Sequence, residues 1–335
     1  MVRIAVDGMG GDFAPHAVIR GAEAVHSARI ADVVLVGDEA RLSPLVHDST
    51  IQIAHTPVEV GMDESPSNAL RKKRDCSMNV ALELMKEGTV QGVVTAGNSG
   101  AAMGFSIFTL GRLSGVDRPA IATLHPNAKG GTTVLIDSGG NVDCKAGHIV
   151  QFAIMGDIFA RCAFGFAAPK VGLLSNATEE TKGNELTREA NSILKTMDLN
   201  YLGYVEGTDI HNGNTDVVVT DGFVGNVALK ITEGIAEMLM LSLKEQARDR
   251  ANDKTGQAVL EETMKRVNRR FDYTNIGGAP LLGVDGISII CHGRSSHHAI
   301  RSAIIMAKNF VDKNLNQSIK ETMRNYESLQ KIKER

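Results

Sequence analysis

The stretch VQGVVTAGNSGAAMG, residues 90–104, joins a short apolar run to a glycine-rich turn and then to a helical pattern. Apolar residues recur at spacings of four and three from Met103 to Leu110, as on one face of a helix. Backbone N–H groups at a helix N-terminus favour an anion. A P-loop would end in a lysine, whereas Ala101 and Ala102 stand there. The stretch predicts a strand, turn and helix that bind an anion, with the cation supplied elsewhere.

Similar units recur along the chain. Strands are expected at 3–6, 32–36, 51–54, 90–95, 120–124, 132–136, 170–174, 202–205, 216–220 and 286–291. Helices are expected after Pro15, after Gly37, over 77–87, after the turn at 95–100, over 147–162, 224–250 and 256–271, and twice at the C-terminal end. This alternation predicts an α/β fold with a doubly wound, mostly parallel sheet, which a hairpin over 120–136 makes mixed. We expect one domain, 1–335, with an appended helical subdomain at approximately 225–275.

Composition narrows the class of protein. The 335 residues are 43% hydrophobic and 22% charged, with a net charge of −3, so no global field draws the chain to nucleic acid or membrane. No apolar run approaches the ~20 residues that span a bilayer, and the N-terminus lacks signal-peptide features. The four cysteines form no C-x-x-C pair, which fits a reducing cytosol and argues against a thiolate zinc site. The expected location is the cytoplasm.

Ligands of such sheets bind beyond the carboxyl ends of the strands, so the segments that follow the strands predict the site. Five of these segments supply candidate phosphate- or substrate-binding residues: Gly8, Gly10, Gly11 and Asp12; Gly97, Asn98, Ser99 and Gly100; Ser138, Gly139 and Asn141; Asp221 and Gly222; and His292, Gly293, Arg294 and Ser295. A sixth, SNATEETKGNE at 175–185, is equally polar. One such segment is most simply a plain turn, but six at one edge predict a small-anion site.

Three basic residues are candidates for the missing cation. Arg294 precedes a helix, Lys230 lies four residues after Asn226, and Lys182 is the one basic residue in its polar, glycine-containing segment. Each taken alone reads best as a surface charge. Lys182 is the strongest candidate because of its surroundings.

The sequence lacks the motifs of several other enzyme classes. In the dinucleotide pattern G-x-G-x-x-G the third glycine is replaced by Phe13, and Asp38 comes too late for the ribose carboxylate. There is no G-x-S-x-G elbow, no H-E-x-x-H motif and no kinase signature. The ten histidines show no metal-like cluster. We expect neither a cofactor nor a metal.

Taken together, the motifs resemble one family. IAVDGMGGD, TAGNSGAAMG, IDSGGN, LLSNATEETKGNE, TDGFVGNVALK and LLGVDGISIICHGRSS are similar, in order and spacing, to the bacterial acyl-ACP:phosphate acyltransferases (PlsX family). The resemblance runs from the first strand to beyond residue 300. Residues 240–275 and the last twenty carry no matching motif.

The resemblance implies transfer of a long acyl chain from acyl carrier protein to inorganic phosphate. The acyl phosphate would then feed a membrane glycerol-3-phosphate acyltransferase, the first step of phospholipid synthesis. It further implies a fold like that of phosphate acetyltransferases and isocitrate or isopropylmalate dehydrogenases, and a homodimer. The family's lysine and asparagine in the TKGNE and DGFVGN motifs correspond to Lys182 and Asn226, which are expected to be catalytic.

The residues themselves suit this chemistry. Phosphate is already anionic at pH 7, and a thiol with a pKa near ~8.5 leaves readily, so no nucleophilic Ser or Cys is required. Placement of phosphate beside the carbonyl can supply roughly 7–11 kcal/mol through effective molarity. One oxyanion donor adds about 2.7–4 kcal/mol.

Three other functions stay open at this point. A short-chain phosphate acyltransferase that uses coenzyme A would share the chemistry and differ in its acyl tunnel and carrier. A nicotinamide-dependent dehydrogenase would share the fold, but needs a dinucleotide site that is not evident. A non-enzymatic anion sensor would need the anion site alone.

Two basic segments are candidates for contact with partners. RKKR at 71–74 and the cluster Lys265, Arg266, Arg269 and Arg270 could dock an acidic carrier protein, although a solvated helix face is an equal reading. An apolar stripe accompanies the second segment: Val259, Leu260, Thr263, Met264, Val267 and Phe271. A basic amphipathic helix suits peripheral contact with the inner face of the cell membrane, whereas packing in the dimer core is the simpler alternative.

Overall fold

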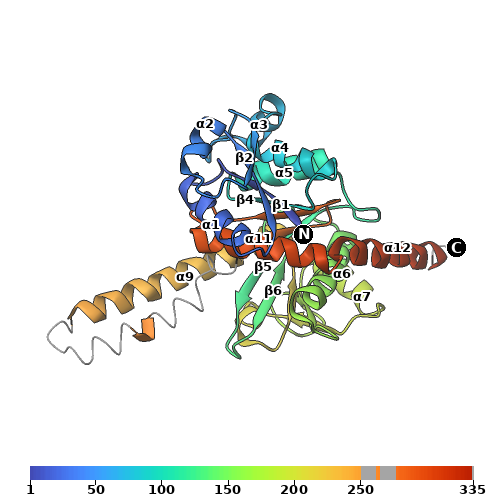
Figure 1. Cartoon of the computed structure of the whole chain (residues 1–335). Coiled ribbons are helices and arrows are strands. Elements are labelled where there is room, and N and C mark those ends of the chain that lie inside the picture. Colours follow the sequence, from blue (N-terminus) through green and yellow to red (C-terminus); the bar gives the residue numbers. More distant parts are fainter. Residues whose placement is uncertain (250–261, 265–276, 334–335) are drawn as a thin grey trace.

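The computed structural model describes residues 1–249, 262–264 and 277–333, and its framework is one 11-stranded sheet (Figure 1). The strands lie in the order β3-β2-β1-β4-β11-β10-β5-β6-β9-β7-β8. Their bounds are β1 Arg3–Asp7, β2 Asp32–Gly37, β3 Gln52–His55, β4 Gly92–Thr95, β5 Ala120–Pro126, β6 Thr132–Ile136, β7 Val171–Leu174, β8 Tyr201–Val205, β9 Val217–Val219, β10 Ala279–Leu282 and β11 Ile287–Ile290.

The sheet has two parallel wings around an antiparallel centre. Strands β3, β2, β1, β4 and β11 are parallel neighbours, and so are β6, β9, β7 and β8. Between the wings, β10 pairs antiparallel with β11 and with β5, and β5 pairs antiparallel with β6. The predicted mixed, mostly parallel α/β fold is confirmed. Because the strands of each wing are parallel, their carboxyl ends meet at one edge of that wing.

Helices cover both faces of the sheet (Figure 1). Ile4 and Val6 of β1 join a core shared with α1, α6 and α11, whereas Ala5 between them joins a second core under α3, α4 and α5. This is the two-residue alternation of a strand buried on both faces. The helices are α1 His16–His26, α2 Glu39–Leu42, η1 Ser43–Leu45, α3 Pro66–Lys72, α4 Ser77–Lys86, α5 Ser99–Leu110, α6 Ala146–Phe164, α7 Glu185–Leu194, α8 Asp209–Asn212, α9 Gly222–Asp249, α11 His297–Asp312 and α12 Leu315–Lys333.

The structure differs from the sequence-based expectations in several elements. All ten expected strands are present, but β10 was missed because Pro280 in a four-residue run argues against a strand. Helices α3 and α7 were also missed, and the helix expected after Gly37 is only the four-residue α2. Apart from 262–264, the helix expected at 256–271 lies outside the described residues.

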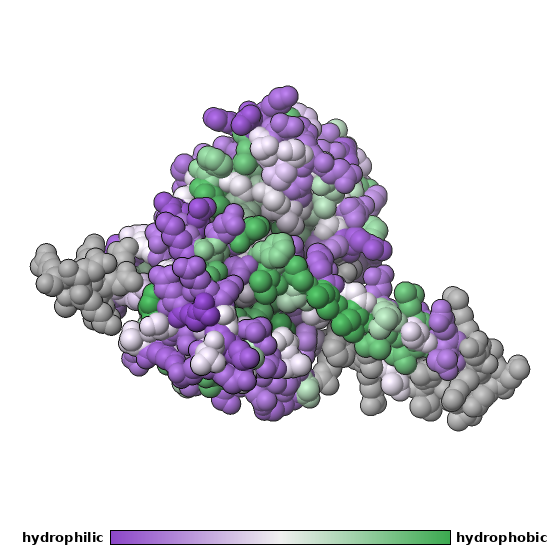
Figure 2. Space-filling view, turned by 180° about the vertical axis from the view of Figure 1, so that it is seen from behind, coloured by the Kyte–Doolittle hydropathy of each residue, from purple (hydrophilic) through white to green (hydrophobic). Residues whose placement is uncertain are grey.

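Helix α9 projects away from the body of the molecule (Figure 1). Large apolar side chains along it are between 41% and 60% exposed: Phe223, Val224, Val227, Ile231, Ile235, Met238, Leu239 and Leu241. They form a band that runs from the body out along the projecting arm (Figure 2). Among the described residues, these side chains therefore present an exposed apolar face.

Candidate active site

Three strand-end segments of the first wing are bound to one another. The amide of Asp12, after β1, donates to the carbonyl oxygen of Gly293, after β11, over 2.8 Å. A Cβ atom on Gly10 would lie 2.6 Å from the amide nitrogen of Gly97, after β4, so only glycine permits this approach. The predicted convergence of these segments is therefore present in the structure.

The carboxylate of Asp7 lies beneath these segments. It is 1% exposed and accepts hydrogen bonds from Thr95 Oγ1 at 2.7 Å and from the amide of Met9 at 3.2 Å. Burial raises the pKa of Asp7, and the hydrogen bonds oppose that rise only in part. Asp7 thus fixes the first wing's segments from behind.

Asp137 organises the second wing in a similar way. Its buried carboxylate accepts four hydrogen bonds, from the amides of Ile121, Gly140 and Asn141 and from the side-chain amide of Asn141, at 2.7–2.9 Å. The amide of Gly222 donates to the carbonyl oxygen of Asn141 over 2.7 Å. The segment after β6 is thereby joined to the start of α9.

A cavity of about 360 Å³ lies between the two groups of segments. It brings together six predicted site residues: Ser99, Ser138, Gly139, Asn226, His292 and Ser295. Ile121, Leu124 and Ile290 supply apolar wall, and Thr123, Lys230 and Glu233 add polar groups. The cavity therefore combines hydroxyl and amide groups with an apolar side, as an acyl transfer to a small anion requires.

Other predicted residues act from outside the cavity wall. Asn98 caps α5 by accepting from the amide of Ala101, and its NH₂ group donates to the carbonyl oxygens of Met62 and Glu64 at 3.0 and 2.8 Å. Asp221 Oδ1 accepts from the amides of Phe223 and Val224 at 2.9 Å, which caps the start of α9. Gly8, Gly10, Gly11, Asp12, Gly97, Gly100, Asn141, Gly222 and Gly293 are not among the lining residues either.

Of the three predicted basic residues, one lines the cavity and two do not. Lys182 and Arg294 have exposed side chains and do not line the cavity, whereas Lys230 does. Lys230 Nζ is held 2.7 Å from Glu233 Oε2 on the same helix. Asn226 lies in the first turns of α9, which begins two residues before the expected start at 224. Its position is fixed by that helix.

The sequence also left residues of the wall unnoticed. Thr123 stands inside an ordinary strand pattern, and the wall at 277–279 adjoins the missed β10. Only the antiparallel pairing of Thr123 with Leu135 brings the threonine to the segment after β6. No local sequence signal marks such a contact.

The cavity offers no activated thiol. Cys291 lines it but is 1% exposed, and burial raises its pKa to about 12. Its sulfur donates to the carbonyl oxygen of Gly277. Within 1–249, 262–264 and 277–333, no group of three or more His, Cys, Asp or Glu residues could hold a metal ion. Over the same residues, no helix has the length and apolarity to cross a membrane.

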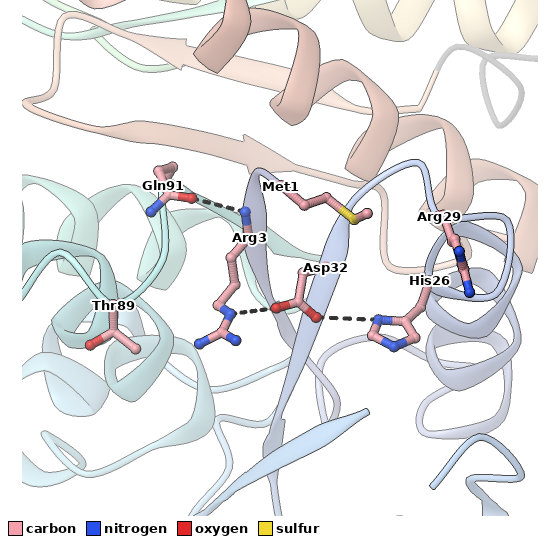
Figure 3. Close-up of a pocket in the computed structure, with 7 residues that line it drawn as sticks. All are labelled: Met1, Arg3, His26, Arg29, Asp32, Thr89 and Gln91. Carbon is pink, nitrogen blue, oxygen red and sulfur yellow. Dashed lines mark hydrogen bonds and ion pairs between the residues drawn. The ribbon is translucent and has the colours of Figure 1, made fainter. Parts of the chain in front are cut away.

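A larger cavity, of about 640 Å³, lies at the amino ends of β1 and β2 (Figure 3). Arg3 Nε donates to Asp32 Oδ2 at 2.6 Å, and the Arg3 amide donates to Gln91 Oε1. His26 Nδ1, 3.4 Å from Asp32, accepts from the amide of Val33, so the neutral ring cannot also donate to the carboxylate. We assign the chemistry to the smaller cavity, because ligands of such sheets bind at the carboxyl ends of strands.

The fold is the α/β fold of the phosphotransacetylases. The phosphotransacetylase from Streptococcus pyogenes superimposes with a TM-score of 0.66 over 93% of this chain and 94% of its own, at 15% identity. The 4-hydroxythreonine-4-phosphate dehydrogenase from Klebsiella pneumoniae has a TM-score of 0.51 over 96% and 100%, at 16% identity. At such identities the likeness concerns the fold alone.

The family follows from the sequence comparisons. The model of the fatty acid synthesis protein family matches residues 2–318. Phosphate acyltransferases from Geobacter sulfurreducens and Trichlorobacter lovleyi are 47% and 48% identical, covering 96% and 98% of this chain and 94% and 96% of theirs. The chain belongs to this family of phosphate acyltransferases. The predicted family is confirmed.

Proposed function

We propose that this acyltransferase moves a long-chain acyl group from acyl carrier protein to inorganic phosphate. The observation that carries the proposal is the adjacency of the cavity to the apolar face of α9. Asn226, Leu229 and Lys230 line the cavity, and the exposed apolar side chains of the same helix begin beside them. A long acyl chain that leaves the cavity would find apolar surface there, whereas an acetyl group would not need it.

In this proposal the site works by placement and by hydrogen-bond donation. Asn226 donates its NH₂ group to the carbonyl oxygen as negative charge develops, and Lys182 supplies positive charge to phosphate or to the leaving thiolate. Lys182 is exposed on the segment after β7, two strands from β6 and its segment 137–141. For Lys182 to act, the segment after β7 would therefore have to move toward the bound substrate.

The acidic carrier protein would dock beside α3, α4 and α5. There a third hollow, of about 680 Å³, is lined by Arg71, Arg74 and Lys86, and by Phe108, which is 78% exposed. Helix α5 connects this hollow to the cavity, since Ser99 begins the helix and Phe108 lies near its end. A basic surface with an aromatic side chain suits an acidic partner. In the other basic segment, Lys265, Arg266, Arg269 and Arg270 lie outside the described residues.

The apolar band of α9 also supports a homodimer, because a band of this length that is exposed among the described residues favours a partner. The proposal has a second part, which concerns the membrane. The protein would be cytoplasmic, and its helical subdomain would contact the inner face of the cell membrane. At the membrane it would release acyl phosphate near the acyltransferase that starts phospholipid synthesis. Of the apolar stripe at 259–271, only Thr263 and Met264 are described, and Met264 is partly buried.

The experiment offers palmitoyl carrier protein and acetyl coenzyme A separately, each with phosphate, and traps acyl phosphate with hydroxylamine. Palmitoyl hydroxamate that forms from palmitoyl carrier protein only when phosphate and the protein are both present, without the corresponding acetyl product, supports the proposal, because hydroxylamine also cleaves thioesters directly. Acetyl hydroxamate as the main product would establish the coenzyme A enzyme, and phosphate binding without either product would leave an anion sensor.

A further inference from the structure

A chain of hydrogen-bonding side chains leads from the cavity into the sheet. Ser138 Oγ lies 2.7 Å from Thr123 Oγ1, which lies 3.0 Å from Nε2 of His125. Ser138 and Thr123 line the cavity, whereas His125 is 2% exposed behind them. The chain therefore connects a buried imidazole to the cavity wall.

The direction of the hydrogen bonds follows from counting protons. Ser138 Oγ donates to the carbonyl oxygen of Leu135 over 3.0 Å, and a hydroxyl has only one proton to give. Thr123 must then donate to Ser138, and His125 Nε2–H must donate to Thr123. Burial, reinforced by the neighbouring His211, lowers the pKa of His125 to about 4, so a neutral ring with its one proton on Nε2 suffices.

His211 anchors the far end of the chain. Its ring meets that of His125 edge-on, with the centroids 5.5 Å apart. Nδ1 lies 3.2 Å from the carbonyl oxygen of Pro126, and Nε2 lies 3.1 Å from Thr232 Oγ1, which also donates to the carbonyl oxygen of Ala228 over 2.9 Å. Thr232 belongs to α9, the helix that carries Asn226. The two rings thereby hold the cavity wall against α9.

This direction makes Ser138 the terminal donor. Its oxygen is occupied by the proton of Thr123, so its own proton must point away, to Leu135 or to an oxygen atom in the cavity. An anionic oxygen is a stronger acceptor than a carbonyl group. We infer that Thr123 and His125 are positioning residues that orient Ser138 to donate to phosphate in the cavity. The inference rests on the proposed function for the identity of the anion.

A double-mutant cycle tests whether Thr123 acts through Ser138. The dissociation constant of inorganic phosphate is measured by calorimetry for wild type, Thr123→Val, Ser138→Ala and the double variant. Thr123→Val should weaken binding about threefold to tenfold, as expected for one neutral hydrogen bond, and Ser138→Ala about tenfold or more. In the Ser138→Ala background, Thr123→Val should add nothing. Additive losses, or unchanged binding in Thr123→Val, would overturn the inference.

Variants of His125 separate orientation from packing. Gln can place an N–H close to the position of Nε2, whereas Phe fills the space without a donor. His125→Gln should bind phosphate more tightly than His125→Phe and raise the KM for phosphate less, and equal losses would contradict the inference. Thr133→Val is the matched control, because Thr133 is buried at the other end of β6 and donates to the carbonyl oxygen of Thr215. It should lower the melting temperature without changing phosphate affinity.

The binding cycle also keeps the two proposals distinguishable. Non-additive phosphate binding without acyl transfer would sustain the inference and refute the proposed function. Acyl transfer with additive binding losses would support the proposed function and refute the inference about Thr123 and His125. A wild-type protein that binds no phosphate would overturn the inference whatever the acyl-transfer assay gives.

Discussion

The hydroxyl group of Thr95 donates a 2.7 Å hydrogen bond to the buried carboxylate of Asp7, which joins the ends of the neighbouring strands β4 and β1. Burial raises the pKa of Asp7 above its ordinary value of 3.8. The folded state therefore holds this proton to a higher pH than the unfolded state does. The contribution of Asp7 to stability is greatest below pH 3.8 and falls as the pH rises through the folded pKa.

Asp7→Asn should remove this part of the pH dependence. We expect the free energy of unfolding, measured with urea from pH 4 to pH 8, to fall less with pH than in wild type. Asp137, whose pKa is raised by burial too, keeps its own share of the slope in both proteins. An unchanged slope would mean that Asp7 is ionised throughout this range in the folded state.

Lys182→Ala and Asn226→Ala should each reduce turnover by about 10²-fold or more, the scale of one lost oxyanion donor. Both side chains are exposed, so the melting temperature should hardly change. Lys195→Ala is the matched control for Lys182, because Lys195 pairs with Glu180 of the same segment at 2.6 Å. Turnover near that of wild type would remove the altered residue from the mechanism.

Gly97→Val should raise the KM for phosphate. A Cβ atom at this position would lie 2.8 Å from the terminal methyl group of Met78, 3.3 Å from Thr95 Oγ1 and 3.4 Å from Asp7 Oδ2, so valine would crowd the segment before α5 and displace the end of Met78. Gly147→Val is the comparison, because a Cβ atom on Gly147 would meet nothing within 4 Å. If the KM values for phosphate and for the acyl carrier protein both stay constant in Gly97→Val, the segment takes no part in binding.

Charge reversal of Arg71 and Arg74 should raise the KM for the acyl carrier protein with little effect on that for phosphate. The difference from wild type should shrink as salt screens exposed charges over about 8–10 Å. Lys170→Glu serves as the control, since Lys170 is exposed and precedes the amino end of β7, in the other parallel wing of the sheet. A rate at low substrate that is flat from low to physiological salt would argue against electrostatic docking.

Ile235→Asp, which places a charge on the exposed apolar face of α9, should weaken the dimer. Val259→Asp and Leu260→Asp should instead abolish flotation with anionic liposomes while the dimer persists. Sedimentation velocity and flotation together distinguish these effects. Glu237→Ala is the control, because a residue two positions from Ile235 points to the other side of the helix. Dimer loss in the Val259 and Leu260 variants would place that stripe in the dimer core.

The sequence predicted ten of the eleven strands of the described residues and the convergence of the segments that follow them. Runs such as those of β1 and β9 are buried on both faces, so their apolar character is continuous and visible. The strand β10 escaped because its stability comes from pairing with β11 and β5, and its own residues include Pro280. The local strand propensity of a segment does not reveal which distant strands it will pair with.

The sequence predicted the glycine-rich segments of the candidate site, but not which of their side chains face the cavity and which cap helices. Asn98 and Asp221 were predicted as binding residues, and in the structure their side chains cap α5 and α9. Thr123 reached the cavity wall only through its cross-strand partner Leu135. Which polar group faces a cavity is decided by hydrogen bonds between segments far apart in the chain.

The position of β10 and β11 has a consequence for how the protein is made. These two strands, 279–282 and 287–290, fill the middle of the sheet, although they are synthesised after the nine other strands of the described residues. Until then, β4 and β5 have no strand between them, and His292 and Ser295 are missing from the cavity. The two parallel wings are therefore joined, and the cavity between them completed, only after these strands have been synthesised.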